Sequence, residues 1–281
     1  MKKIVLISFL VFTNLTFAQE CFTFDTRFID CLDKWVILPQ DEFSDSDSFT
    51  FGYVFFDEDF NLTFQKEGTF EIEDSCLFSV TKSKKVIRTK IEPSKTLVAV
   101  VSQDKFSELQ ILETPKWVKK LKENAETYFY LGYLYNEWGE NHRAFYALQK
   151  AQALNPKFAG LEKELAFTYN SLGMYDKAIE ILQQLREKHP KDAYIYRELI
   201  FALTKSAKLK EAAYNLRYSI SICKDKKYHG ENCLYVLRLA FDENDQKTFS
   251  QFLRKAKVWN KGNAKALDLI KLMETEMKKK D

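Results

Sequence analysis

The side chains that most often carry out catalysis are few in this chain and widely spaced. Its three histidines, His142, His189 and His229, are far apart in the sequence and fall at or beside expected helix ends. The sequence has no G-x-S-x-G elbow, no glycine-rich phosphate loop and no H-E-x-x-H pair, the motifs of serine hydrolases, nucleotide-binding enzymes and zinc proteases. No pair of acids stands out for acid–base chemistry. We therefore expect no enzyme and no cofactor, with the histidines on the surface.

The five cysteines are compatible with disulfides and do not indicate a metal site. No C-x-x-C pair is present, which argues against a zinc knuckle and a thioredoxin-type redox site. The acidic run at 41–48 lacks the glycine and the closing glutamate of a calcium loop, so we expect no bound metal. We hypothesise two local bridges, Cys21–Cys31 and Cys223–Cys233, with Cys76 free. The alternative is that all five thiols are reduced and buried as small apolar groups.

A second set of side chains recurs at a constant interval between residues 125 and 226. Leucines, alanines, tyrosines, glycines and prolines come into register when this segment is divided into three blocks of equal length, 125–158, 159–192 and 193–226. The matching residues are Leu131, Leu165 and Leu199; Gly132 and Ala166; Tyr135 and Tyr169; Gly139 and Gly173; Ala144, Ala178 and Ala212; Leu148, Leu182 and Leu216; and Pro156 and Pro190. The third block departs from this pattern, with Ile200 at the small position and Lys224 in place of the proline.

This register resembles that of the tetratricopeptide repeat (TPR) family. The resemblance implies two antiparallel helices in each block, with small residues where they cross, glycine in the turn and proline after the second helix. One such block cannot bury its apolar face alone, so the blocks must stack into an α-solenoid. Residues 227–281 are expected to add a degenerate fourth helix pair and a C-terminal capping helix.

In that family the first helix of each block lines a concave face that binds extended peptides or partner helices, and the resemblance implies the same face here. Asparagine amides can hydrogen-bond a peptide backbone in both directions, and an arginine can form two parallel bonds to a carboxylate. Aromatic residues at the ninth position of each block argue against the carboxylate-clamp subtype, which has polar and cationic residues there. The candidate partner-binding residues are Phe129, Tyr133, Asn136, Lys163, Phe167, Asn170, Tyr194, Arg197, Phe201 and Lys205.

Short apolar runs of alternating polarity indicate antiparallel β structure over residues 19–112. The aromatic residues from Phe49 to Phe55 alternate with small or polar ones, and turn residues separate the runs. Six strands are expected, as a meander that forms a small sandwich or a curled sheet. Residues 113–124 are expected to form a linker and a helix, beginning at Pro115, whose Trp117 caps the first repeat.

The first eighteen residues have the layout of a secretory signal peptide. Lys2 and Lys3 precede an apolar run, and Ala18 ends the segment with a small residue. We expect cleavage after Ala18 and a periplasmic or secreted mature protein. No later segment approaches membrane-spanning length without charges, so we expect no integral membrane span in the mature chain.

Charge divides along the chain in a way that favours two domains. Residues 20–74 hold fifteen acids and three bases, whereas residues 114–281 hold 21 acids and 31 bases. The bases are dispersed, and export separates the chain from most nucleic acid, so nucleic acid is not an expected partner.

These features together predict an α+β chain of two domains: a small antiparallel β domain followed by an α-solenoid of TPR helix pairs. The predicted function is that of an exported, non-catalytic interaction scaffold or adaptor that holds a peptide or partner segment, from an envelope or secreted protein, in the concave groove. One alternative places a ligand-binding or enzymatic site in the β domain, with the repeats as its scaffold. Another has the acidic β domain occupy the groove itself.

Overall fold

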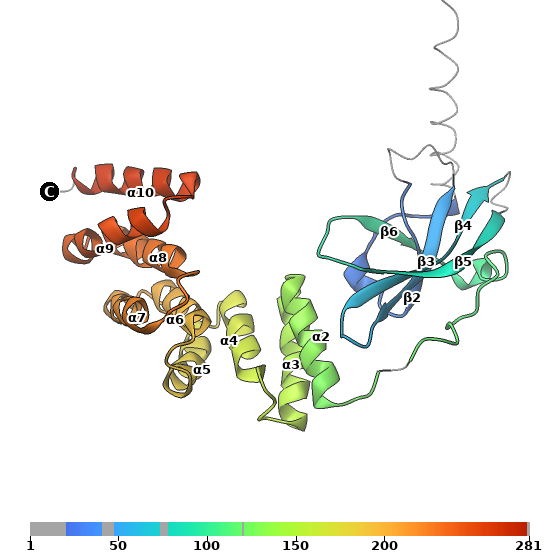
Figure 1. Ribbon diagram of the computed structural model, residues 1–281, viewed down its shortest axis with the longest axis horizontal. Coiled ribbons are helices and arrows are strands. Elements are labelled where there is room, and N and C mark those ends of the chain that lie inside the picture. The colour runs from blue at the N-terminus through green and yellow to red at the C-terminus, as the bar shows by residue number, and fades with distance from the viewer. Residues whose placement is uncertain (1–20, 41–47, 74–77, 120, 280–281) are drawn as a thin grey trace, which may run out of the picture. The chain divides into compact units, whose positions relative to one another are not determined.

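The computed structural model of the 281-residue chain describes residues 21–40, 48–73, 78–119 and 121–279. It forms two compact units, which meet in the sequence between Glu123 and Asn124 (Figure 1). The first unit holds an antiparallel sheet and the second holds helical pairs, so the predicted α+β class with the β region first is confirmed. The predicted signal peptide, residues 1–18, and Cys76 lie outside the described residues.

The strands of the described residues form one antiparallel sheet in the order β1-β6-β2-β3-β4-β5 (Figure 1). The strands from β2 to β5 follow one another as the expected meander, but β6 returns to lie between β1 and β2. The strands are β1 (Thr26–Arg27), β2 (Lys34–Ile37), β3 (Phe49–Phe56), β4 (Leu62–Ile72), β5 (Phe78–Lys90) and β6 (Leu97–Val100), with short 3-10 helices at Phe28–Asp30 and Gln103–Lys105.

Aromatic side chains form the core on one face of this sheet. Trp35 on β2 pairs with Tyr53 on β3, and their rings meet edge to face at 5.1 Å. Phe51 and Phe70 belong to the same buried cluster, with ring centroids 6.0 Å apart. Gly68 lies beneath the Phe51 ring, where an added Cβ would come within 3.0 Å of a ring carbon. Aromatic pairs of this kind contribute about 0.5–1.5 kcal/mol each beyond the area that they bury.

The capping helix predicted from Pro115 is wrong. The described residues around Pro115 form turns, and the Trp117 ring packs against Phe55 at 5.0 Å and against Tyr53 at 6.1 Å. The Arg88 guanidinium lies over two of these rings, 5.4 Å from Phe55 and 5.6 Å from Trp117. Trp117 therefore packs against the core of the β unit. The aromatic side chains of the sheet bury more of the indole surface than a position on a short surface helix would.

The described residues of the second unit form antiparallel helix pairs that follow one another in sequence order, and one closing helix (Figure 1). The pairs are α2 (Ala125–Glu137) with α3 (Asn141–Leu154), α4 (Leu161–Ser171) with α5 (Tyr175–Lys188), α6 (Ala193–Lys205) with α7 (Leu209–Ile222), and α8 (His229–Asp242) with α9 (Gln246–Trp259), and the closing helix is α10 (Ala264–Met277). The apolar core runs through the later pairs without a break and includes residues of α10.

Small residues and glycine turns shape the helix pairs. An added Cβ on Gly132 would come within 2.5 Å of Leu148 Cγ, so α2 and α3 cross too closely for a side chain there. Gly139 and Gly173 both have a φ of 72°, the left-handed conformation that commonly ends a helix. Ala207 takes the corresponding place in the third block with a φ of 55°. Its Cβ makes this conformation unfavourable by about 1 kcal/mol.

Neither predicted disulfide forms: Cys31, Cys223 and Cys233 are free and buried. Burial raises the pKa of the Cys31 thiol to about 11 and that of Cys233 to about 12, which keeps the reactive thiolate scarce at neutral pH. Cys223 and Cys233 instead pack in the apolar core of the helical unit. The alternative of five reduced thiols fails as well, because Cys21 is disulfide-bonded.

Candidate functional site

A pocket in the helical unit gathers five of the predicted partner-binding residues. It has a volume of about 360 Å³ and is lined by residues of α4, α5, α6 and α8. Consecutive first helices stack in a solenoid, so equivalent positions of successive blocks come together here. The predicted partner-binding residues in the lining are Phe167, Asn170, Arg197, Phe201 and Lys205, and the other lining residues are Ser171, Tyr175, Glu198 and Tyr235.

Aromatic rings form the walls of this pocket. The Phe201 ring lies 6.1 Å from the Tyr175 ring and 5.3 Å from the Tyr235 ring, both edge to face, and Phe167 is a further lining residue. All four side chains are half-buried. Aromatic walls have few rotatable bonds, so they offer a large apolar area to a ligand at a small cost in conformational entropy.

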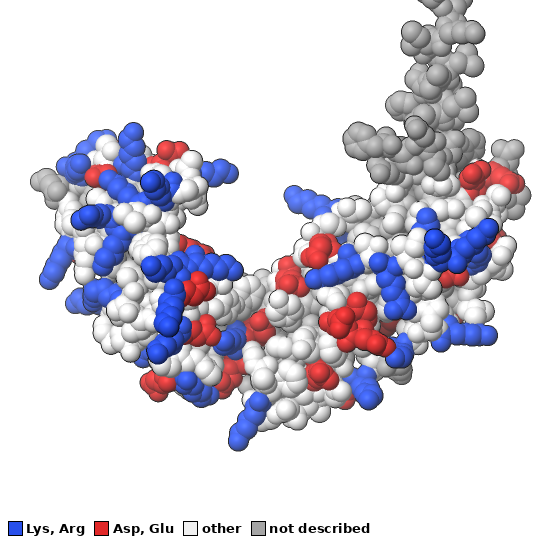
Figure 2. Space-filling view, in the orientation of Figure 1, with Lys and Arg blue, Asp and Glu red and all other residues white. Residues whose placement is uncertain are grey.

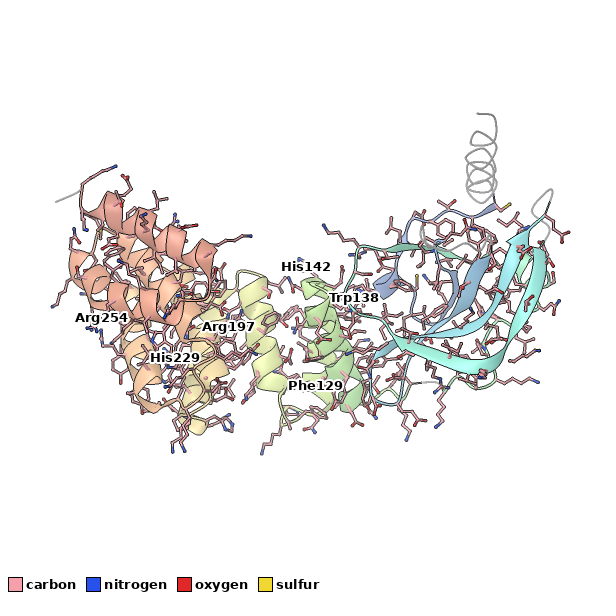
Figure 3. The ribbon with its side chains drawn as sticks, turned by 45° about the horizontal axis from the view of Figure 1, so that its top comes forward. Phe129, Trp138, His142, Arg197, His229 and Arg254 are labelled. Atoms are coloured by element: carbon pink, nitrogen blue, oxygen red, sulfur yellow. The ribbon has the colours of Figure 1, made fainter. Side chains whose placement is uncertain are left out.

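Arg197 is not available to grip a partner's carboxylate. Its Nε and Nη2 donate to the two carboxylate oxygens of Glu231 at 3.2 Å each, and its Nη1 pairs with Glu198. The Tyr235 hydroxyl donates to the same Glu231 at 2.5 Å. These acids raise the pKa of the Arg197 guanidinium despite its partial burial, so it stays charged. Arg197, on α6 in Figure 3, therefore ties the third helix pair to the fourth.

Lys205 is the cation of the pocket that pairs with no carboxylate of the described residues. Its ammonium lies 5.5 Å from the centre of the Phe201 ring, and the side chain is exposed. A cation over the face of an aromatic ring is held by the ring's quadrupole and can still bind an acceptor on its open side. Lys205 is thus the positive charge that the pocket presents to a ligand.

The floor of the pocket is a buried amide–carboxylate pair. Asn170, which is 4% exposed, donates through Nδ2 to Glu198 Oε2 at 2.8 Å. Glu198 is 2% exposed, and burial raises the pKa of its carboxyl even though Asn170 and Arg197 lower it in part. The Asn170 Nδ2 donor and the Glu198 carboxylate are committed within the protein, which makes Asn170 a structural link between α4 and α6. Its buried Oδ1 accepts from no donor of the described residues.

Of the other predicted residues, Phe129 and Tyr194 pack within the solenoid. Phe129 is 8% exposed, with its ring 4.8 Å from that of Phe158 and against the bare Cα of Gly160. Tyr194 is half-buried, and its ring lies 6.1 Å from that of Tyr228. The expectation that Phe129 lies open on a binding face is wrong, because the turn before α4 folds over it.

Tyr133, Asn136 and Lys163 lie outside the pocket. Tyr133 is 43% exposed, whereas Asn136 is 7% exposed and donates to Glu164 Oε2 at 3.0 Å. Lys163 forms an ion pair with Asp192. Burial raises the pKa of the Asp192 carboxyl, but the Lys163 ammonium outweighs this effect, and the pKa is lowered overall. These contacts are internal, so Tyr133 alone of the three presents a free surface.

The residues that sequence reasoning missed carry recognisable signals in hindsight. Glu198 lies one block after Glu164 at the same position of the repeat, and both accept from the asparagine of the preceding block. Tyr235 lies on the degenerate fourth pair, one block after Phe201, so extending the aromatic series by one block would have found it. Tyr175 begins a second helix, which lies outside the set of positions that the family resemblance covers.

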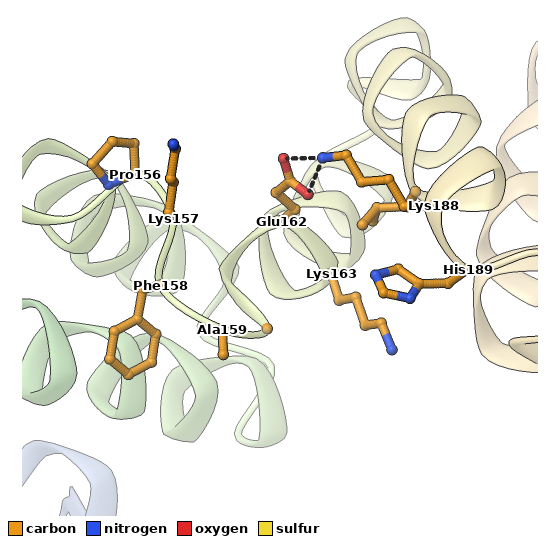
Figure 4. Close-up of a pocket in the computed structure, with 10 residues that line it drawn as sticks. Pro156, Lys157, Phe158, Ala159, Glu162, Lys163, Lys188 and His189 are labelled. Atoms are coloured by element: carbon orange, nitrogen blue, oxygen red, sulfur yellow. Dashed lines mark hydrogen bonds and ion pairs between the residues drawn. The ribbon is translucent and has the colours of Figure 1, made fainter.

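A second pocket, of about 350 Å³, opens beside the turn that precedes α4 (Figure 4). Lys157, Lys163, Lys188 and His189 contribute to its lining. Lys188 donates to both oxygens of Glu162 at 3.1 and 3.0 Å, as the dashed lines in Figure 4 show. Since Lys163 is paired with Asp192 as well, Lys157 is the lysine of this lining that forms no ion pair within the described residues.

His229 is the histidine whose predicted surface position is wrong. It is 2% exposed, and its ring lies 4.9 Å from that of Trp259. Burial lowers the pKa of its imidazole, so the ring is neutral at physiological pH. His142 and His189 are exposed as expected.

Within the described ranges, no three His, Cys, Asp or Glu side chains cluster in a way that could bind a metal ion. Over the same residues, no helix has both the length and the apolar character that a membrane span requires.

The basic residues of the second half gather toward its C-terminal helices. Residues 246–265 contain six bases and no acid, and Figure 2 shows lysine and arginine side chains over α9 and α10. In α10, Glu274 neutralises part of this charge through Lys257 and Lys278. The positive surface is therefore separate from the aromatic pocket, to which Lys205 contributes the charge.

The family comparison agrees with the repeat register. Residues 139–200 match the tetratricopeptide repeat family model. Among solved structures, MamA from Desulfovibrio magneticus RS-1 is 16% identical, with a TM-score of 0.45, over 51% of this chain and 79% of that chain. MamA of MSR-1 is 19% identical, with a TM-score of 0.44, over 50% of this chain and 79% of that chain. No curated protein matches the sequence.

Proposed function

Because the helical unit belongs to the tetratricopeptide repeat family, whose members are protein-interaction scaffolds, we propose that it holds an extended segment of a partner protein in the pocket of α4, α5, α6 and α8. The observation that carries this proposal is the aromatic wall of Phe167, Tyr175, Phe201 and Tyr235 beside the Lys205 ammonium. The pocket's volume of about 360 Å³ lies in the range of ligand sites, and it suits one large side chain of a partner.

The chemistry of the lining indicates what the segment carries. The half-buried rings around Phe201 favour an aromatic or large aliphatic anchor, because such a side chain removes the most apolar area from water. Lys205 then binds a backbone carbonyl or a carboxylate next to that anchor. Arg197 contributes rigidity instead of charge, since Glu198 and Glu231 already neutralise it.

Selection from a random peptide library with the full chain tests this proposal. Selected peptides should share an aromatic or large aliphatic residue beside an acceptor. Phe201→Ala should weaken the best of them by about 30-fold in a fluorescence anisotropy titration, since a buried aromatic anchor contributes about 2 kcal/mol. Lys205→Gln should weaken it by a smaller factor.

Tyr146→Ala is the matched control, because this tyrosine on α3 is 62% exposed and lies outside the pocket lining. It should leave the affinity unchanged. The proposal fails if Phe201→Ala and Tyr146→Ala have the same effect, or if no peptide is enriched.

We also propose that the chain meets its partner after export, in the periplasm or outside the cell. Lys2, Lys3, the apolar run and Ala18 support this, as the parts of a signal peptide in their usual order. Mass spectrometry of the protein isolated from its host should find Gln19 at the N-terminus. An intact leader in a cytoplasmic fraction would refute export.

A further inference from the structure

A third pocket lies in the β unit, on the sheet face opposite the aromatic core. Its volume is about 390 Å³, within the range of about 300–1,000 Å³ that small-molecule sites occupy. Thr50 lines it and alternates along β3 with Phe49 and Phe51, which belong to the core cluster on the other face. The sequence alone left open whether the β domain holds a ligand-binding site. This pocket is a candidate position for such a site.

The floor and walls of this pocket are apolar. The apolar residues of the lining come from the first 3-10 helix, the residue after β2, β4, β5 and the residue after β5; they are Phe28, Leu38, Phe64, Ile87 and Ile91. Phe64 is 6% exposed, whereas Ile87 is 47% exposed. The floor is therefore well packed, and part of one wall is open to a ligand.

Gly52 shapes the floor. An added Cβ on this residue would come within 2.5 Å of the Phe64 ring and 2.2 Å of the Gln65 carbonyl oxygen. The absence of a side chain lets the Phe64 ring lie over β3. A flat ring between two strands is a surface against which an aromatic or aliphatic body can stack.

Lysines give the pocket its charge. Lys66 lines it, is half-buried, and forms no ion pair with any carboxylate of the described residues. Lys90 pairs with Glu92 at 3.2 Å, so those two charges cancel. The Lys66 charge therefore remains over an apolar floor. A positive charge that has no carboxylate partner, beside apolar side chains, is suited to an anionic ligand with an apolar body.

We propose that this pocket binds a small organic anion with an apolar body, such as a monocarboxylate with a hydrocarbon chain or ring. The body packs against Phe64 and Ile87, and the acid group pairs with Lys66. The hydroxyls of Thr50 and Thr89, which also line the pocket, provide hydrogen bonds to the acid oxygens.

Another copy of this chain fits the same place poorly. It would add its strand along β5, which is the edge of the sheet in the described residues and carries five bases and no acid. The pairing of β5 with β4 is also interrupted, with the register shifting between Lys66 and Gly68. Like charges and a bulged edge both oppose strand-to-strand pairing of a second copy at this edge.

Two fluorescent probes with nearly the same aromatic body separate the apolar contribution from the charge. Anilinonaphthalene sulfonate carries an acid group, and phenylnaphthylamine does not. Titrated into the full chain, the sulfonate should bind about tenfold more tightly than the neutral probe, which corresponds to one ion pair in a partly buried site. Decanoate, a hydrocarbon monocarboxylate, should displace the bound sulfonate.

Variants assign the binding to this pocket. Lys66→Gln should remove the preference for the sulfonate and leave the neutral probe unaffected, whereas Lys84→Gln, an exposed lysine of β5 outside the lining, should change neither. Ile87→Asp should weaken both probes by at least tenfold. Its neighbour Val86, which is 72% exposed and outside the lining, provides the control Val86→Asp.

Circular dichroism of each variant checks that the sheet is intact. Phe201→Ala, in the helical unit, should leave probe binding unchanged. Probe binding to the β unit is thereby distinguished from binding to the aromatic pocket of the helical unit. The proposal is overturned if the chain binds neither probe, if Lys66→Gln and Lys84→Gln behave alike, or if Phe201→Ala abolishes the signal.

Discussion

Two joints between successive first helices, α2 with α4 and α4 with α6, contain an asparagine at the same place in the repeat. At the first joint, Asn136 donates to Glu164 at 3.0 Å and accepts from the Thr168 hydroxyl at 3.0 Å. At the second joint, Asn170 donates to Glu198 at 2.8 Å, but its buried Oδ1 finds no donor among the described residues.

The reason for this difference is one residue. Ala202 occupies the position of the third block that Thr168 occupies in the second, and its methyl group cannot donate a hydrogen bond. Both joints therefore share the hydrogen bond from the asparagine Nδ2 to a glutamate. The hydrogen bond to the asparagine Oδ1 depends on a different position of the repeat, which is threonine in the second block and alanine in the third. The second joint, which is less completely bonded, is also the one that forms the aromatic pocket. Stability and ligand contact are thus distributed unevenly along the solenoid.

The largest expected effect comes from removing the asparagines. Asn136→Ala should lower the free energy of unfolding by about 3 kcal/mol, because Glu164 loses its amide donor and the contact of Asn136 with the Thr168 hydroxyl is lost. The Thr168 hydroxyl itself keeps the Glu164 backbone carbonyl as an acceptor at 2.8 Å. Asn170→Ala should lower it by about 2 kcal/mol, since Glu198 keeps its ion pair with Arg197 and no bond to Oδ1 is lost. Urea denaturation measures both values. Equal losses would mean that the two joints are energetically the same.

Exchanging the hydroxyl between the joints is expected to have the next largest effect. Thr168→Val, which keeps the shape of the side chain, should lower the free energy of unfolding by about 1.5 kcal/mol because it leaves Asn136 Oδ1 unpaired. Ala202→Ser should raise it by about 0.5–1 kcal/mol by giving Asn170 a donor. A destabilising Ala202→Ser would show that the second joint has no room for the hydroxyl.

The turn after each first helix provides an independent comparison of the same blocks. Ala207→Gly should stabilise the chain by about 1 kcal/mol, because it relieves the left-handed strain at a φ of 55°. Gly173→Ala, at a φ of 72°, should destabilise it by a similar amount. Thermal denaturation of both variants gives the answer, and a loss of stability for Ala207→Gly would contradict the assignment of strain.

The smallest effect concerns pH. Burial raises the pKa of the Glu198 carboxyl, so the folded chain holds this proton more tightly than the unfolded chain does. The charged Glu198 carboxylate therefore lowers the free energy of unfolding at neutral pH. This loss of stability is removed as the pH falls through the raised pKa of the folded chain toward about 4.3, the pKa of a glutamate in the unfolded chain.

Glu198→Gln has no proton to lose, so the free-energy difference between variant and wild type should shift in favour of the wild type as the pH falls from 7 to 5. Glu211→Gln, on the exposed face of α7, is the control. A difference that stays constant for Glu198→Gln over this range would show that the carboxyl titrates as it does in the unfolded chain.

Much of the fold followed from local patterns in the sequence. Alternation of aromatic residues predicted β3, and the turn glycines Gly139 and Gly173 adopt the left-handed conformation that the repeat required. Crowding between α2 and α3 at Gly132 likewise agrees with the small residue expected where two helices cross. Such features depend on close neighbours along the chain or one helix away, which a periodic sequence reveals.

Half of the predicted site residues came together, and the roles of several changed. Phe167, Phe201 and Lys205 line a pocket, as a shared helix face would suggest. Phe129 lies in the core, because the turn before α4 covers it. Arg197 has the charge and the spacing of a ligand-binding residue, but Glu231 from the next block neutralises it.

The sequence by itself therefore determined the repeat register, the order of the two units and the residue types on the first helices. Only the tertiary structure decided which of those side chains are still free. Ion pairs such as Arg197 with Glu231, and packing such as Trp117 on Phe55, join residues that are distant along the chain. The physical reason is that burial and charge pairing depend on distances in space, and a constant sequence period specifies which positions are equivalent but not which partners meet them.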